Sequence, residues 1–238
     1  MKHKKHLLTL ALLASLTTNS AQALLIDRGN GLLYDNVLKV TWLQDANYAK
    51  TSGYSTTGLM DWVSANTWAD NLIFDGLTGW RLATNTRING NSFNSNVTYD
   101  GTTDYSYNIT SPKSELSYMY YVNLGLKGVS SMTGAYQSDF GIFGNGTYGG
   151  QANIGPVINM QSHIYWSGAE FSPGSGYGWA FNSQAGVQGA MPYNLYSEFY
   201  AWAVRPGDVI AVPEPATFWL FSIGLMSLLS LRRRGNIG

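Results

Sequence analysis

The chain has 238 residues, of which 45% are hydrophobic, 14% aromatic and 12% charged, a composition that excludes an intrinsically disordered protein. It contains no cysteine, which excludes disulfides, thiolate metal sites and thiol nucleophiles. The 14 basic and 14 acidic residues cancel, but six basic residues stand at the two ends, so residues 24–211 hold 8 basic and 13 acidic side chains, a net charge of −5. This charge argues against a nucleic-acid partner, because phosphate binding requires clustered Lys and Arg.

The amino end has the pattern of a secretory signal peptide over residues 1–23. The basic stretch MKHKKH precedes the apolar run Leu7–Leu16, and a polar stretch then leads to Ala21-Gln22-Ala23, which fits an A-x-A cleavage site. We therefore expect a signal helix that uses the secretory translocon and is cut by signal peptidase, which recognises Ala21 and Ala23. The exported domain then covers residues 24–211.

Short strands and one helix are predicted in the first part of this domain. Gly29-Asn30-Gly31 separates two apolar runs and predicts a hairpin, and Val37–Trp42 has the residues of a strand. Residues Leu59–Phe74 predict the best helix. Its expected apolar stripe, with Trp68 at the edge, consists of Leu59, Trp62, Ala65 or Asn66, Ala69, Leu72 and Ile73. Gly76 and Gly79 end the pattern, and Trp80–Leu82 begins another strand.

The middle of the domain is polar and rich in glycine. Residues Asn85–Pro112 predict a long loop, and Gly141–Gly155 predicts a second one, since six of its fifteen residues are glycine. Between them Ser114–Leu124 has a weaker helical pattern, in which Ser114 is the expected cap. The residues expected to pack there are Leu116, Met119, Tyr120 and Val122.

Three aromatic runs near the end, His163–Ser167, Tyr177–Asn182 and Phe199–Pro206, predict an antiparallel meander. The sequence therefore predicts an α+β fold: a compact single domain with short antiparallel strands, one or two helices and long loops. Most of the seven tryptophans in residues 24–211 are expected in its core.

Six segments, in order, resemble the family named after the carboxyl-terminal domain of Legionella collagen-like protein, also called DUF1566. They are LIDRGNGLLYDNVLKVTWLQDANYA, DWVSANTWADNL, WRL, YWSGAE, WAFN and AWAVRPGDV. The resemblance implies a compact α+β domain distantly like the C-type lectins and the formylglycine-generating enzymes. The chain departs from the family's WRLP pattern at Ala83, and it lacks the cysteines that the enzymes use.

The tail resembles the PEP-CTERM sorting signal over residues 212–238. Val212–Pro215 reads VPEP, with Pro213, Glu214 and Pro215 as the motif, and an apolar run of 16 residues, Ala216–Leu231, follows. As a helix this run spans about 24 Å, somewhat less than the roughly 30 Å of a membrane core. The basic cluster that ends it is Arg232, Arg233 and Arg234. The positive-inside rule keeps both basic ends in the cytoplasm and places the domain outside the inner membrane.

The resemblance of the tail implies processing by an exosortase, in a Gram-negative bacterium that secretes exopolysaccharide. An ordinary membrane anchor, with the same topology, remains open.

Few residues point to chemistry. His163 is the one histidine outside the signal peptide, so we expect no histidine metal site, no cofactor and no catalytic residue. Glutamates Glu115, Glu170 and Glu198 leave a two-carboxylate glycan hydrolase open, and Asp100–Asp104 leaves open calcium binding in a turn. Arg81 and Arg205 are expected in structural ion pairs, with Asp208 as one partner.

Tyrosines in the loops are the better candidates for contact with a ligand, because their flat rings stack on sugars. The candidates are Tyr99, Tyr105, Tyr107, Tyr148 and Tyr177. We therefore expect an envelope or extracellular-matrix protein that is not an enzyme and associates with exopolysaccharide or a surface, as biofilm components do. A carboxylate-dependent glycan hydrolase is the alternative, and an ice- or surface-binding protein a weaker one, since no regular Thr or Asn repeat is found. Because the domain is acidic, a neutral or metal-bridged polysaccharide is the expected ligand.

Overall fold

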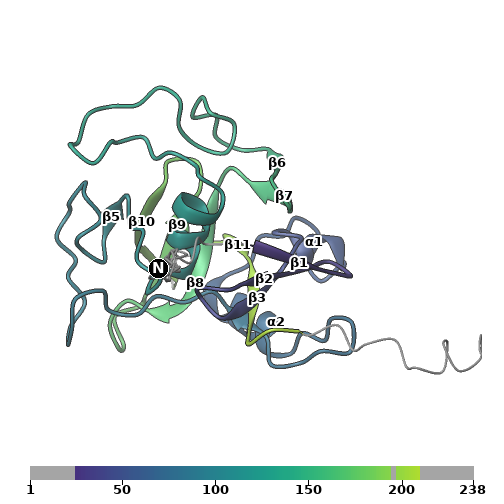
Figure 1. Cartoon of the computed structure of the whole chain (residues 1–238). Coiled ribbons are helices and arrows are strands. Elements are labelled where there is room, and N and C mark those ends of the chain that lie inside the picture. Colours follow the sequence, from purple (N-terminus) through teal and green to yellow (C-terminus); the bar gives the residue numbers. More distant parts are fainter. Residues whose placement is uncertain (1–24, 194–196, 210–238) are drawn as a thin grey trace, which may run out of the picture.

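The predicted hairpin starts the first of two large sheets in the computed structural model, which describes residues 25–193 and 197–209 (Figure 1). Asn30 and Gly31 turn the chain with φ of 52° and 78°, the left-handed region that such tight turns require. The sheet has the order β1-β2-β3-β12-β4. Its strands are β1 (Leu25–Gly29), β2 (Leu32–Asp35), β3 (Val40–Leu43), β12 (Ala203–Pro206) and β4 (Arg81–Leu82).

The second sheet carries the aromatic runs and lies on the other side of the molecule from β1 and β2 (Figure 1). Its order is β11-β8-β9-β10-β5, antiparallel except for the parallel pair of β11 with β8. Its strands are β11 (Tyr200–Ala201), β8 (Ile164–Glu170), β9 (Tyr177–Asn182), β10 (Val187–Pro192) and β5 (Ser106–Tyr107). A separate hairpin pairs β6 (Gln151–Ile154) with β7 (Val157–Gln161).

The helices are few and short. They are α1 (Tyr48–Thr51), α2 (Trp62–Asp70) and α3 (Glu115–Tyr118), and α3 continues as a π-helical segment, Met119–Asn123. The predicted α+β class is thus confirmed as a mixed fold of mostly strands. Among the described residues no helix is long and apolar enough to cross a membrane. The predicted signal helix and membrane helix lie outside those residues.

The meander prediction is wrong for its third run. The first two runs form β8 and β9, which do pair antiparallel. The next strand along the sheet is β10, which was not predicted. The segment Phe199–Pro206 instead divides between the two sheets: Tyr200 and Ala201 pair with β8, whereas residues from Ala203 onward pair with β3 and β4.

The predicted helix at 59–74 is shorter than expected and buries a different face. Asp61 caps it, since its carboxylate accepts hydrogen bonds from the Ser64 backbone N–H at 2.8 Å and hydroxyl at 2.6 Å. Trp68 is only 3% exposed, whereas Ile73 lies beyond the helix and is 67% exposed. The stripe is therefore centred on Ala65, Trp68 and Ala69.

Two other local predictions also need correction. The strand predicted from Val37 begins at Val40, because the Asp35 carboxylate accepts the backbone N–H groups of Val37 and Leu38, both at 2.8 Å, and holds a turn there. Ser114 precedes α3, but its hydroxyl makes no capping bond and accepts instead from Gln188 Nε2 at 3.2 Å.

Trp202 joins the two sheets, because it stands between β11 and β12 where the chain passes from one sheet to the other. It is 1% exposed, and its ring meets Trp42 edge to face with centroids 4.7 Å apart. Its indole N–H donates to the Leu43 carbonyl at 2.7 Å. Packing and a buried hydrogen bond thus fix the crossing point between the sheets.

We expect Trp202→Phe to lower the free energy of unfolding by about 2–3 kcal/mol, because it leaves a cavity and removes the bond to the Leu43 carbonyl. The matched control is Trp179→Phe: Trp179 is 0% exposed, but its indole nitrogen has no hydrogen-bond partner among the described residues. The control should lose about 1 kcal/mol less. Equal losses in urea denaturation would contradict the role of the Trp202 hydrogen bond.

Candidate functional site

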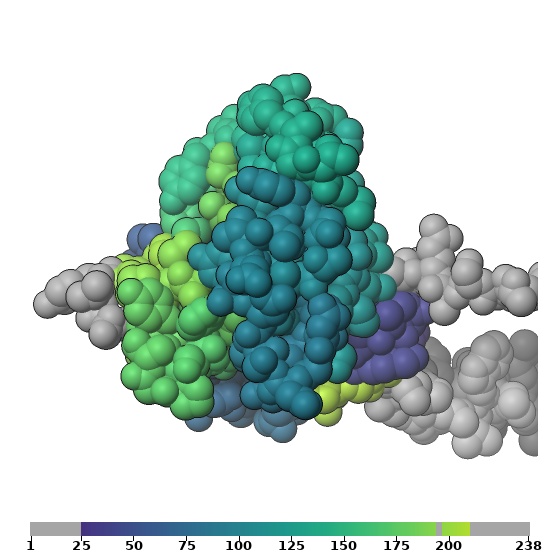
Figure 2. All heavy atoms as spheres, turned by 90° about the vertical axis from the view of Figure 1, so that its left-hand side faces the viewer, coloured from purple at the N-terminus to yellow at the C-terminus, as the bar shows by residue number. Residues whose placement is uncertain are grey.

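Two adjoining hollows lie where the long loop 85–112 meets the segment after β8. One has a volume of about 420 Å³ and the other about 470 Å³. They share Arg87 and Phe93, so we treat them as one site, the loop hollow. Its described lining comprises Asn85, Thr86, Arg87, Gly90, Asn91, Ser92, Phe93, Ser95, Lys113, Ala169, Glu170, Phe171, Ser172 and Pro173. Figure 2 shows the loop and the segment around residue 172 side by side on this face.

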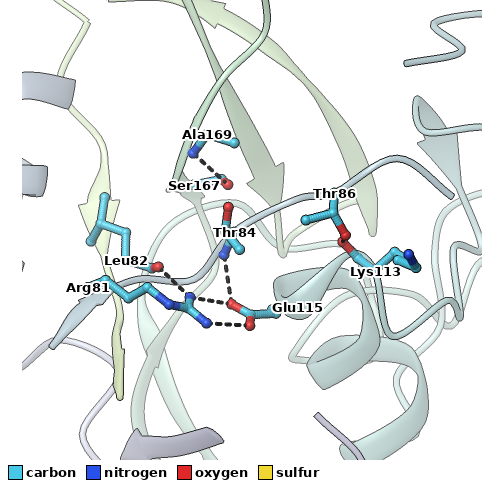
Figure 3. A network of polar contacts seen from close by, with 8 residues as sticks. All are labelled: Arg81, Leu82, Thr84, Thr86, Lys113, Glu115, Ser167 and Ala169. Carbon is cyan, nitrogen blue, oxygen red and sulfur yellow. Dashed lines mark hydrogen bonds and ion pairs between the residues drawn. The ribbon is translucent and has the colours of Figure 1, made fainter. Parts of the chain in front are cut away.

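An ion pair between Arg81 and Glu115 supports one wall of the hollow (Figure 3). Two guanidinium nitrogens of Arg81 each donate to one Glu115 carboxylate oxygen, both at 2.7 Å. The Thr84 backbone N–H donates to the same carboxylate at 2.8 Å. Glu115 is 7% exposed, and a buried carboxylate needs such partners to offset the loss of water.

The backbone beside this ion pair forms a short ladder that brings two lining segments together. The Glu115 N–H donates to the Thr84 carbonyl at 3.1 Å, and the Thr86 N–H donates to the Lys113 carbonyl at 2.7 Å. Residues 84–86 therefore run antiparallel to 113–115. Arg87, the next residue along one segment, is in this way placed near Lys113 on the other.

Asp104 holds the outer part of the loop. It is 1% exposed, and its two carboxylate oxygens accept the backbone N–H groups of Ile88 and Asn94, both at 2.7 Å. The calcium turn considered for Asp100–Asp104 is not supported, because Asp104 is already committed to these two bonds. No cluster of three or more potential metal ligands occurs in residues 25–193 and 197–209.

Aromatic rings form the inner wall of the hollow. The Phe93 ring lies 5.1 Å from the buried Trp179 ring, and Phe171 lies 5.0 Å from the same ring on β9. The Arg87 guanidinium stands over Phe93, 5.6 Å from its centroid, within the range of a cation–π contact. The wall therefore offers apolar ring surface beside a cation.

Glu170 is the one carboxylate in the described lining. It accepts the Tyr193 hydroxyl at 2.6 Å and the Gly174 N–H at 3.1 Å. The hydrogen bond to Glu170 raises the pKa of the Tyr193 hydroxyl. Tyr193 in turn stacks on Trp62 at 4.8 Å. Of the other glutamates considered for catalysis, Glu115 is paired with Arg81 and Glu198 is exposed.

The structure does not bring the five candidate tyrosines into one patch. Tyr99 and Tyr107 stack on each other with centroids 5.6 Å apart, and Tyr105 packs 6.1 Å from Trp179. Tyr148 and Tyr177 are exposed but lie elsewhere, on the glycine-rich loop and at the start of β9. None of the five lines the loop hollow.

Tyr148 lies against His163, and its hydroxyl is paired with Nε2 of the imidazole. The other imidazole nitrogen, Nδ1, is buried without a partner among the described residues. Phe199 and Tyr200 also face this ring, with centroids 6.1 and 5.5 Å away. Burial in these surroundings lowers the pKa of His163.

The other expected ion pairs have different partners. Arg205 donates to the Thr78 carbonyl at 2.8 Å, and Asp208 pairs with Arg28. The expectation that Asp208 is the partner of Arg81 or Arg205 is therefore wrong. Ala83, the departure from the family pattern, is fully buried and donates its N–H to the Trp202 carbonyl at 3.4 Å. A proline there has no N–H to donate.

No pattern in the sequence marked Arg87, Lys113, Phe93 or Phe171 as residues of a site. The sequence does offer one indication of this site: Arg87 and Lys113, two of only eight basic residues in residues 24–211, lie near the two ends of the polar loop. The long-range contacts that bring Phe93 to Phe171 through Trp179 leave no local pattern.

Comparison with known proteins identifies the tail. Residues 211–234 match the PEP-CTERM protein-sorting motif. The chain carries an exosortase sorting signal. This motif implies processing by an exosortase and export to the cell surface, as the tail predicted. No curated protein and no solved structure matches the chain. The motif residues Pro213–Pro215 and Arg232–Arg234, and the signal residues Ala21 and Ala23, lie outside the described structure.

We expect Glu115→Gln to lower the free energy of unfolding by about 1.5–3 kcal/mol, because hydrogen bonds to a charged group in a buried place are lost. Asp139→Asn is the matched control, since it neutralises a carboxylate in an ion pair with Lys127 in which both side chains are exposed to solvent. Thermal or urea unfolding should detect no change in the control. Similar losses in both variants would contradict a structural role for the Arg81–Glu115 pair.

His163 predicts a pH dependence of stability. Its pKa in the folded state lies below the value of about 6.5 in an unfolded chain, so the unfolded state takes up protons first as the pH falls. The contribution of His163 to the free energy of unfolding should therefore be fully present above about pH 6.5, and the free energy of unfolding should decline as the pH falls below that value. His163→Gln should flatten this part of a urea-denaturation series, whereas Tyr148→Phe, which keeps the imidazole, should not. An unchanged slope in His163→Gln would contradict the assignment.

Proposed function

We propose that this is an exported surface protein that binds extracellular polysaccharide in the loop hollow and does not cleave it. The proposal rests on one observation: in the loop hollow, exposed polar side chains lie beside aromatic rings, on a backbone that buried hydrogen bonds hold in place. Sugars have apolar ring faces and hydroxyl groups at their edges, so they fit such a mixture. Both volumes, about 420 and 470 Å³, fall within the range of small-molecule pockets.

The lining provides both kinds of contact. Phe93 and Phe171 offer partly exposed ring surface, and a row of short polar side chains borders them. These are Asn91, Ser92, Ser95 and Ser172. Amides and hydroxyls of this kind donate to and accept from sugar hydroxyls. Since the Asp104 and Glu115 contacts hold the backbone beneath them, little order has to be gained on binding.

A binding role is better supported than the hydrolase alternative. Glycoside hydrolysis requires two carboxyl groups that flank the scissile bond, and the described lining provides Glu170 alone. The sorting motif supports the same setting, since it brings the protein to the surface where exopolysaccharide lies. We also propose that residues 24–211 form a DUF1566-like domain. The precursor would be held at the inner membrane before its release to the surface or matrix.

The test is retention of the purified full-length protein on polysaccharide from the producing bacterium. Phe93→Ala should weaken retention at least threefold, because it removes a stacking surface, whereas Tyr177→Ala, an exposed ring outside the hollow, should leave it unchanged. The length of the polysaccharide should not change during incubation. No retention would overturn the binding role, and shortened chains that disappear with Glu170→Gln would favour the hydrolase.

A further inference from the structure

The loop hollow concentrates the cations that the domain leaves unpaired. Residues 25–193 and 197–209 contain eight basic side chains. Four of them have a carboxylate or carbonyl partner: Arg28, Arg81, Lys127 and Arg205. The four without an ion pair or side-chain hydrogen bond in these ranges are Lys39, Lys50, Arg87 and Lys113. Two of those four, Arg87 and Lys113, line the same hollow.

The fold places both cations in one hollow without an ion pair for either of them among the described residues. Thr86, the residue before Arg87, donates its N–H to the Lys113 carbonyl at 2.7 Å, and the side chains of Arg87 and Lys113 line the same hollow. None of the nearby carboxylates that the structure describes forms an ion pair with them. Glu115 binds Arg81, Asp104 binds backbone N–H groups, and Glu170, which also lines the hollow, accepts from the Tyr193 hydroxyl and the Gly174 N–H. Two cations that line one hollow and have no ion-pair partner among the described residues favour an anionic ligand.

The side-chain amide of Asn85 also points to a ligand in this hollow. It lines the same hollow and is only 6% exposed. Its amide nitrogen has no hydrogen-bond partner in the part of the chain that the structure describes. Buried amide groups normally have a partner, and an oxygen atom of a bound ligand would supply one here. Two cations and an unsatisfied amide donor together match a group with several acceptor oxygens.

We propose that the loop hollow binds the carboxylate of an acidic sugar, such as a uronic-acid unit of a polysaccharide. Arg87 and Lys113 hold the carboxylate, Asn85 donates to a ligand oxygen, and Phe93 contacts the sugar ring. This inference rests on the proposed polysaccharide binding and replaces the neutral ligand expected from the net charge of −5. The net charge of the domain does not decide which ligand the hollow binds, because salt screens the charges that lie more than about 8–10 Å from the site.

The test compares polygalacturonate with the same polymer after chemical reduction of its carboxylates to hydroxymethyl groups. Both are offered to the full-length protein, with the producer's own polysaccharide as a third ligand. We expect binding of polygalacturonate at least tenfold tighter than binding of the reduced polymer, and weaker at higher salt. Arg87→Gln and Lys113→Gln should each weaken polygalacturonate binding about three- to tenfold.

Lys50→Gln is the matched control, because it removes another exposed positive charge without an ion pair among the described residues, from α1 on the opposite side of the molecule from the loop (Figure 1). It should leave binding unchanged, and all variants should have the melting temperature of the unchanged protein. Equal binding of both polymers would overturn the acidic-sugar inference and leave polysaccharide binding intact. Failure to bind any of the three ligands would overturn both proposals, and equal losses in Lys50→Gln would overturn the assignment to this hollow.

Discussion

The ion pair between Arg81 and Glu115 is the contact on which the candidate site depends. It joins β4, at the edge of the first sheet, to α3, and it brings the backbone at Thr84 against the same carboxylate. The ladder between residues 84–86 and 113–115 follows from that junction. Without it, the loop that leaves β4 and the segment that enters α3 would lose their common support. The backbone that carries the lining cations is therefore held by a charge pair whose two residues are not part of the described lining.

The remaining walls come from the second sheet, and Trp202 makes the two parts one body. Its place at the crossing between β11 and β12 ties the sheet that carries β4 to the sheet that carries Trp179. Phe93 and Phe171 then pack on Trp179 from two separate loops. Surface loops position binding groups well only when a rigid scaffold supports them, and the two sheets provide that scaffold.

The sequence predicted those elements of the fold that are determined by residues close together in the chain. Gly29 to Gly31 indicated the hairpin, and two aromatic runs indicated β8 and β9, because turn chemistry and strand-forming composition are local properties. It did not show that residues 199–206 serve two sheets, or that Asp104 binds the loop backbone, because both depend on partners distant in the chain. The candidate tyrosines were chosen by composition, whereas the hollow is defined by packing. The sorting tail was found because its three features stand together in a short segment.

The central claim is that the loop hollow holds an acidic sugar through Arg87, Lys113 and Asn85. The most direct measurement is a crystal structure of the protein with a short oligogalacturonate. The account predicts one carboxylate within hydrogen-bonding distance of Arg87 and Lys113, with a sugar ring against Phe93. An oligosaccharide bound instead on the stacked pair of Tyr99 and Tyr107, with the loop hollow empty, would contradict it.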